Sequence, residues 1–211
     1  MMKHFKTLRG SRYPMGARWK PQGTNFSIFT RRATGVELVL YESSDSQEPF
    51  QVIQLDSSVN RTFFFWHIYV RGIPQGIYYT WRIDGPSDTI AHGDRFDRRR
   101  ELLDPWTRAA SSTLWNRRKA CIADTGNWPS MRSMIVDDSY DWKGDRPVNH
   151  APENMIIYEV HVGGFTRDVS ANVSHPGTFS GIIEKIPYLK GLGITDVELL
   201  PVMAFDEQDL P

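Results

Sequence analysis

Short apolar and β-branched runs, separated by turn-forming residues, fill the first half of the chain. The runs lie at 25–29, 36–41, 62–70 and 77–83, with Gly, Pro, Asn and Asp residues between them. Short, closely spaced strands of this kind are typical of an antiparallel β-sandwich. The pattern therefore predicts a mainly β fold, with a sandwich over residues 1–110.

The regular pattern is lost between residues 111 and 152. This segment contains turn and extended signals such as Asn127-Trp128-Pro129 and Trp142-Lys143-Gly144. Its tryptophans and the pair Ile135-Val136 are too apolar for a free linker. We interpret it as a connecting segment that packs on a neighbouring part of the protein.

A third pattern begins after residue 152. A nearly continuous apolar run at 155–162 is typical of a strand buried on both faces. Helical spacing follows at 179–192, where Pro187 must kink the helix or start a second short one. A second apolar run at 195–202 completes a strand–helix–strand unit with parallel strands. A parallel sheet needs further strands and helices to cover it, so residues 153–211 are predicted to be an incomplete barrel or sheet.

The charge balance and the single cysteine narrow the function classes. The 211 residues include 25 Lys+Arg and 25 Asp+Glu, so no global basic field attracts nucleic acid or an anionic membrane. No stretch approaches the roughly 18 apolar residues of a membrane span, and no secretory signal is recognised at the start of the chain. Cys121 is the only cysteine, which rules out an internal disulfide and favours a reducing, cytoplasmic compartment.

No metal or cofactor site is predicted. The acidic run at 206–209 lacks the Gly and the terminal Glu of a helix–loop–helix calcium loop. A cysteine-based zinc cluster is impossible with one cysteine. Gly191-Leu192-Gly193 is too short for a dinucleotide fingerprint.

Five segments carry a resemblance to a known family. They are the strings at 13–42 and 64–86, HGDRFDRRRELLDPWTRA at 92–109, IIYEVHVGGFT at 156–166 and the string at 175–207. In this order they resemble the N-terminal part of isoamylase-type glycogen debranching enzymes, within the alpha-amylase superfamily of glycoside hydrolases. Gly163 departs from the family pattern, because many debranching relatives carry Arg at this position.

The resemblance implies a fold and an activity. The fold would be an immunoglobulin-like β-sandwich of the glycogen-binding-module type, followed by the first βαβ unit of a truncated (β/α)8 TIM barrel. The activity of the complete enzyme would be hydrolysis of α-1,6-glucosidic branch linkages in glycogen. In this family the catalytic carboxylates come from the fourth, fifth and seventh barrel strands. This chain supplies two strands, so no catalytic residue is assigned and the chain itself is expected to be inactive.

An α-glucan, either glycogen or a malto-oligosaccharide, is the expected ligand, without a cofactor. The substrate-binding candidates are His161, near the strand end where barrel sites form, Phe165 as a pocket wall, and Trp66 and Trp81 on the sandwich. Packing is the alternative interpretation for each of them, because strand side chains alternate and about half must point inward. The neighbouring-strand carboxylates Glu159 and Glu198 are interpreted as structural rather than as a catalytic pair.

Three alternatives remain open. The chain can be a non-catalytic glucan-binding module that tethers a protein to glycogen. It can associate with a second chain that carries the missing barrel portion. It can also be a fragment of a branching or trehalose-releasing enzyme with the same layout.

Overall fold

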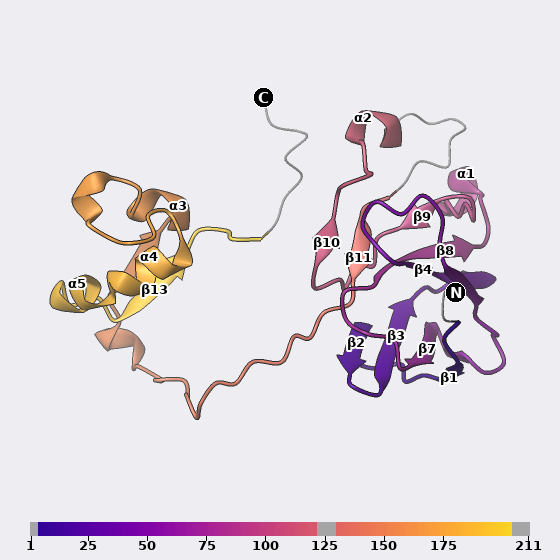
Figure 1. Cartoon of the computed structure of the whole chain (residues 1–211), viewed down its shortest axis with the longest axis horizontal. Coiled ribbons are helices and arrows are strands. Elements are labelled where there is room, and N and C mark those ends of the chain that lie inside the picture. The colour runs from indigo at the N-terminus through magenta and orange to yellow at the C-terminus, as the bar shows by residue number, and fades with distance from the viewer. Residues whose placement is uncertain (1–3, 122–129, 204–211) are drawn as a thin grey trace. The chain divides into compact units, whose positions relative to one another are not determined.

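The chain forms two compact units. The computed structural model describes residues 4–121 and 130–203 (Figure 1). The first unit is Met1–Tyr140 and the second is Asp141–Pro211. No helix in the described part of the chain is both long and apolar enough to cross a membrane.

Two antiparallel sheets build the first unit. The first sheet has the strand order β1-β7-β3-β2, with β6 added to β7. Its strands are β1 (Thr7–Arg9), β2 (Gly16–Lys20), β3 (Gly23–Phe29), β6 (Arg61–Thr62) and β7 (Phe65–Arg71). The second sheet has the order β10-β11-β8-β4-β5, with β9 also paired to β8. Its strands are β4 (Gly35–Tyr41), β5 (Gln51–Gln54), β8 (Tyr78–Asp84), β9 (Glu101–Leu102), β10 (Ala110–Ser111) and β11 (Arg132–Met134). Two short helices, α1 (Thr89–His92) and α2 (Arg117–Ala120), lie in the connections.

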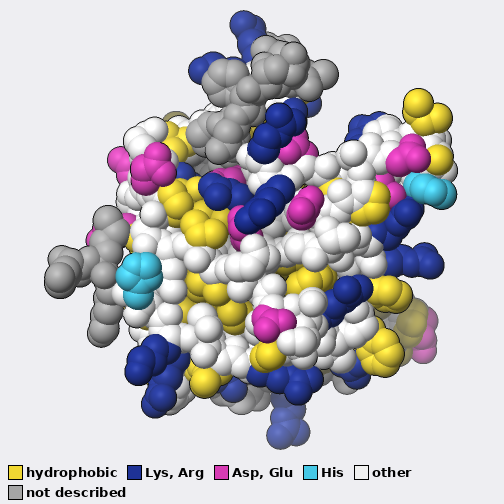
Figure 2. Space-filling view, turned by 90° about the vertical axis from the view of Figure 1, so that its right-hand side faces the viewer, with side chains coloured by type: hydrophobic (Ala, Val, Ile, Leu, Met, Phe, Trp, Pro, Cys, Tyr) yellow, Lys and Arg dark blue, Asp and Glu magenta, His cyan; other side chains and the backbone are white. Residues whose placement is uncertain are grey.

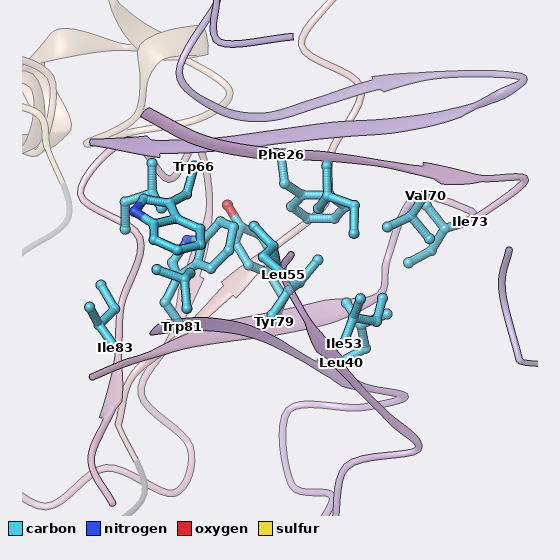
Figure 3. Packing of buried hydrophobic residues seen from close by; sticks show 14 of the residues in the cluster. Phe26, Leu40, Ile53, Leu55, Trp66, Val70, Ile73, Tyr79, Trp81 and Ile83 are labelled. Atoms are coloured by element: carbon cyan, nitrogen blue, oxygen red, sulfur yellow. The ribbon is translucent and has the colours of Figure 1, made fainter. Parts of the chain in front are cut away.

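The core lies between these sheets, as predicted from the alternation of apolar residues. Figure 3 shows side chains from both sheets pointing into the shared space, among them Phe26, Trp66, Tyr79 and Trp81. The ring centroids of Phe26 and Tyr79 are 5.0 Å apart in an edge-to-face arrangement. Aromatic pairs prefer this arrangement to face-to-face stacking. Removing such side chains from water contributes roughly 1.5–3 kcal/mol each. The predicted β-sandwich is confirmed.

Two details of the strand pattern differ from the prediction. The run at 62–70 is divided into β6 and β7 by a turn at Phe63 and Phe64, and Phe63 adopts a positive φ of 54°. Strands β10 and β11 extend the second sheet beyond residue 110, into the segment interpreted as a connection. Ile135 of that segment is fully buried in the sandwich core, whereas Trp142 is exposed. Residue Trp128 lies outside the described residues.

A buried carboxylate ties the sandwich together after β9. Asp104 is fully buried, and its Oδ2 accepts hydrogen bonds from the Tyr79 hydroxyl (2.9 Å) and Trp81 Nε1 (3.1 Å). Its Oδ1 accepts from the Trp106 N–H (2.8 Å), and its own N–H donates to Ser133 Oγ (3.1 Å). Burial raises the pKa of Asp104, although the three donors act in the opposite direction. Asp104 thus joins β8, β11 and the chain segment that follows β9.

The second unit is a strand–helix–strand arrangement. Its strands β12 (Ile157–Val160) and β13 (Asp196–Leu199) pair in parallel, as predicted. The elements around them are η1 (Pro152–Asn154), α3 (Val162–Phe165), η2 (Val169–Ala171), α4 (Phe179–Glu184) and α5 (Ile186–Gly191). Pro187 lies in the first turn of α5, where a missing N–H costs no helical hydrogen bond. The proline therefore starts a second helix, which is one of the two outcomes predicted for it.

Little of the apolar surface in this second unit is buried. Of its described apolar side chains, Val160 and Leu189 are buried. Ile157 remains 57% exposed and Val197 42% exposed, although both belong to the strand pair. Parallel strands normally occur with both sheet faces covered, so this degree of exposure is unusual for such a pair.

Replacing Asp104 by alanine should destabilise the sandwich strongly. Asp104→Ala removes the acceptor of two buried side-chain donors, each of which costs about 1–3 kcal/mol when left unsatisfied. We expect the free energy of unfolding to fall by roughly 2–5 kcal/mol in urea titrations. Asp84→Ala, at an exposed aspartate of β8, is the control and should change it by less than about 0.5 kcal/mol. Equal losses for the two variants would contradict this account.

A comparison of the wild type with Asp104→Ala at different pH values tests the raised pKa of Asp104. Because burial raises that pKa above its ordinary value of 3.8, the folded protein keeps the proton to a higher pH than the unfolded chain does. The associated stabilisation is complete below pH 3.8 and is lost as the pH rises through the raised pKa. The difference in unfolding free energy between wild type and Asp104→Ala should therefore be larger at acidic than at neutral pH. A difference that does not vary with pH is the opposing result.

Candidate functional site

The two tryptophans proposed as sugar contacts lie inside the sandwich. Trp66 on β7 and Trp81 on β8 both have 0% exposed surface and point into the space between the sheets (Figure 3). Trp81 packs 6.4 Å from the ring of Phe26, measured between centroids, and its indole N–H is held by Asp104. As placed, neither ring offers a face to a sugar. Both tryptophans therefore serve the packing role that was the alternative interpretation.

The second sheet carries a buried polar network centred on Glu101. The carboxylate of Glu101 accepts hydrogen bonds from the Tyr41 hydroxyl, from Thr80 Oγ1 (3.0 Å) and from Arg82 Nη2 (2.7 Å). Glu101 is 9% exposed and Tyr41 is 2% exposed. Burial, and then the hydrogen bond to Glu101, raise the pKa of Tyr41. These groups bind one another, so they are not free to bind a ligand.

Arg132 on β11 fixes the loop that follows β4. Its Nη1 donates to the carbonyl oxygens of Ser43 (3.1 Å) and Ser44 (3.2 Å), and its Nη2 donates to that of Ser46 (2.8 Å). Its guanidinium carbon lies 3.5 Å from the ring centroid of Tyr41. A planar guanidinium can bond several acceptors and stack on a ring at once. The loop is therefore held in one conformation by a residue 86–89 positions away.

A small polar cleft of about 120 Å³ lies beside this network. Arg98 reaches across it to the carboxylate of Glu37 and towards Gln54 (3.5 Å).

On the face of the molecule drawn in Figure 2, basic and acidic side chains lie beside each other with hydrophobic side chains between them. This face therefore presents no large area of a single charge.

His161 begins helix α3 directly after strand β12. Its Nδ1 accepts a hydrogen bond from the Gly164 N–H (2.9 Å), which leaves the ring proton of the neutral form on Nε2. A Cβ atom at Gly163 would lie 3.1 Å from His161 Cε1, so glycine allows the ring to occupy this position. The imidazole is exposed to solvent. Its helix-capping role is thus visible in the structure, and its Nε2 is available to a ligand.

Phe165, the other candidate of this unit, is partly buried. Its ring centroid lies 6.0 Å from that of Tyr158, and its N–H donates to the His161 carbonyl oxygen (3.0 Å). The structure therefore brings Phe165 and His161 into one turn of chain. The aromatic ring itself packs beside Tyr158 of β12.

Glu159 and Glu198 are direct neighbours in the parallel ladder of β12 and β13. Both are exposed in this unit. Among the residues that the structure describes, no group of three or more His, Cys, Asp or Glu side chains is placed to hold a metal ion. The acidic run at 206–209 lies outside the described residues. The two glutamates form an adjacent carboxylate pair on an open sheet face.

A family model accounts for the sandwich. Residues 14–107 match the model of carbohydrate-binding module 48, described as the isoamylase N-terminal domain. This part of the chain is therefore similar to the N-terminal domain of isoamylases. The match begins just before β2 and ends just beyond Asp104, so it includes the core aromatic residues and the buried carboxylate. The family resemblance read from the sequence is confirmed.

Curated relatives extend the similarity over nearly the whole chain. Isoamylase 1, chloroplastic, of Oryza sativa subsp. japonica is 35% identical over 208 residues, which cover 96% of this chain and 25% of the relative. The glycogen debranching enzyme of Yersinia enterocolitica is 32% identical over 206 residues, which cover 92% of this chain and 30% of the relative. The chain therefore spans between a quarter and a third of the length of these relatives.

Solved structures share the fold. Apo pullulanase from Paenibacillus barengoltzii matches with a TM-score of 0.68 and 21% identity, over 94% of this chain and 28% of the pullulanase. Pullulanase from Bacillus acidopullulyticus matches with a TM-score of 0.68 and 25% identity, over 93% of this chain and 22% of that protein. The Paenibacillus enzyme has also been solved in complex with maltohexaose and α-cyclodextrin.

Sequence reasoning missed Asp104, Glu101 and Arg132, which organise the second sheet. All three bind partners far away in the sequence, and the partners of Arg132 are backbone carbonyl groups that carry no sequence signal. The Asp104-Pro105-Trp106 string was part of the family resemblance, which is the one signal that pointed to this position.

Replacing Arg132 by lysine should loosen the loop at 43–48. Arg132→Lys keeps the charge, but lysine cannot bond three carbonyl oxygens and stack on Tyr41 in the same geometry. We expect the backbone amides at 43–48 to exchange hydrogen at least about tenfold faster, because local opening becomes easier. Hydrogen exchange with mass spectrometry measures this. Arg71→Lys, at the exposed end of β7, should leave the exchange unchanged, and an unchanged loop in Arg132→Lys would refute the role of the guanidinium.

Proposed function

We propose that this chain is the N-terminal part of an enzyme that hydrolyses α-1,6-glucosidic branch linkages in glycogen or a related α-glucan. The observation that carries the proposal is the parallel strand pair β12–β13, which follows an isoamylase N-terminal domain and is open on its apolar surfaces. The names of the relatives, isoamylase and glycogen debranching enzyme, support the reaction. The activity belongs to the whole protein, of which this chain would be a non-catalytic portion.

The proposed domain order gives each unit a place in that enzyme. Residues 1–110 would be the carbohydrate-binding-like sandwich, residues 111–152 the connection, and residues 153–211 the beginning of a (β/α)8 barrel. Exposed side chains on the strand pair, such as Ile157 and Leu199, would be covered by the following strands and helices. This covering supplies the burial that the second unit lacks by itself.

Hydrolysis requires two catalytic carboxyl groups, and we propose that both lie outside this chain. Retaining glycosidases place a nucleophilic carboxylate and a carboxylic acid roughly 5–5.5 Å apart on either side of the scissile bond. The resemblance assigns these groups to later barrel strands. Glu159 and Glu198 belong to the first two strands, so we assign them a structural role in the barrel interior. The proposed ligand is an α-glucan, and the proposed location is the cytoplasm, although the rice relative carries the word chloroplastic in its name.

His161 is proposed to contact the glucan in the complete enzyme, with Phe165 as part of the pocket wall. Barrel sites form at the carboxyl ends of strands, and His161 follows β12 with its Nε2 unoccupied by any described hydrogen bond. In a full-length enzyme, His161→Ala should lower kcat/KM on branched glucan by about tenfold. His150→Ala, at an exposed histidine before η1, serves as the control. Unchanged kinetics for His161→Ala would remove this residue from the site.

The chain and the whole protein should behave differently towards glycogen. We expect the purified 211-residue chain to release no reducing ends from glycogen, since the catalytic pair lies elsewhere in the proposed enzyme. The protein detected in its own cells should be far larger than 24.3 kDa, because a complete barrel alone takes about 250 residues. Reducing ends released by the purified chain would show that it contains a working carboxylate pair. A band at 24.3 kDa would instead favour a glucan-binding module without catalysis.

A further inference from the structure

A short segment of chain crosses the outer face of the first sheet. Residues 10–14, called the strap below, are held by Ser27 Oγ, which donates to the Arg12 carbonyl oxygen (2.7 Å). The Asn25 side chain accepts from the Ser11 N–H (2.7 Å) and donates to the Ser11 carbonyl oxygen (2.9 Å). A Cβ atom at Gly10 would lie 2.6 Å from a backbone nitrogen, so glycine permits this close approach. The strap is therefore fixed on the sheet.

An open groove of about 390 Å³ runs along one side of the strap. It is lined mainly by residues of β1, β2, β3, β7 and the strap, among them Arg9, Ser11, Tyr13, Lys20, Asn25 and Tyr69. Tyr69 lies between Leu8 and Asn25 in the register of three neighbouring strands, so its side chain belongs to the outer face. The ring of Tyr13 is 53% exposed. The groove thus combines two phenol rings with hydroxyl, amide and cationic groups.

This combination suits a neutral sugar chain. The apolar C–H face of a pyranose ring packs on an aromatic face, while its hydroxyl groups need donors and acceptors at the rim. Lys20 and Arg9 have no ion-pair partner among the described residues, so their donors are available. Asn25 is held rigid by Ser11, which reduces the conformational entropy lost on binding. No carboxylate lines the groove.

The other side of the strap is chemically different. There the rings of Phe65, Phe29 and Phe64 form a ridge, with successive centroid distances of 5.2 and 6.1 Å, and the Tyr13 ring of the strap lies 5.0 Å from that of Phe65. The three phenylalanines carry no hydrogen-bonding side-chain group. The ridge therefore offers stacking without the polar contacts that would orient a sugar. It also provides a control surface for an experiment, since Phe64 is 41% exposed and does not line the groove.

We propose that this groove, beside the strap on the first sheet, binds a segment of α-glucan chain, with sugar rings stacked on Tyr69 and Tyr13. The proposal rests on the proposed function for the class of ligand and adds the place where the sandwich binds it. Glu101 and Arg132 of the second sheet are buried and bond to groups within the chain, so they do not compete for this role.

The test is binding of maltohexaose to the complete 211-residue chain, measured by calorimetry and by retardation in glycogen-containing gels. Tyr69→Ala and Tyr13→Ala should each weaken binding at least about fivefold, since each removes one stacked ring. Tyr69→Phe keeps the ring and should retain most of the affinity. Phe64→Ala, on the ridge, should bind like the wild type. Thermal unfolding of each variant verifies that the sandwich remains folded.

Each result separates this proposal from the proposed function. Wild-type affinity in both tyrosine-to-alanine variants would overturn the groove, and loss of binding in Phe64→Ala would move the site to the ridge. If the wild-type chain binds no maltohexaose while the longer protein still hydrolyses glycogen, the groove is wrong and the debranching function stands. If the longer protein acts on no α-glucan, the proposed function fails on its own evidence.

Discussion

The architecture of the sandwich depends on one carboxyl group placed inside an aromatic core. The Asp104 carboxylate is surrounded by Tyr79 and Trp81, which supply both apolar contact and hydrogen-bond donors. Burying such a group is tolerated because each oxygen has a donor. Its N–H meanwhile reaches Ser133 of β11. One residue therefore fixes the central strand β8, the late strand β11 and the path of the chain between them.

The two units differ in how much of their apolar surface they bury. The sandwich encloses large side chains such as Trp66 and Leu38 between its sheets, and the described strands provide both faces of that core. The second unit contains a parallel pair whose apolar residues stay largely exposed. A parallel pair is a part of a larger sheet in nearly all proteins. The first unit therefore encloses its own core, whereas the second leaves most of its described apolar side chains exposed.

The two sheets of the sandwich differ in how their polar side chains are paired. On the second sheet, Glu101 and Arg132 bind neighbours within the chain and hold a loop in place. On the first sheet, the strap covers the middle of the face and leaves tyrosine rings and unpaired cations beside it. A surface whose polar groups are already paired has little to offer a ligand. This difference is the physical basis for proposing that a glucan binds on the first sheet.

The sequence alone predicted the central strands of the sandwich, the strand–helix–strand unit, a break in the helix at Pro187 and the resemblance to isoamylase-type enzymes. Each of these follows from local periodicity, from proline chemistry or from segments of chain that can be recognised in order. Tertiary structure alone decided that Trp66 and Trp81 face inward, that β11 joins β8, and that Asp104 lies in the core. Alternation along a strand predicts two faces, but only packing of distant strands decides which face is buried. Trp66 and Trp81 therefore lie in the core, and the groove proposed as a glucan site is lined by residues that are far apart in the sequence.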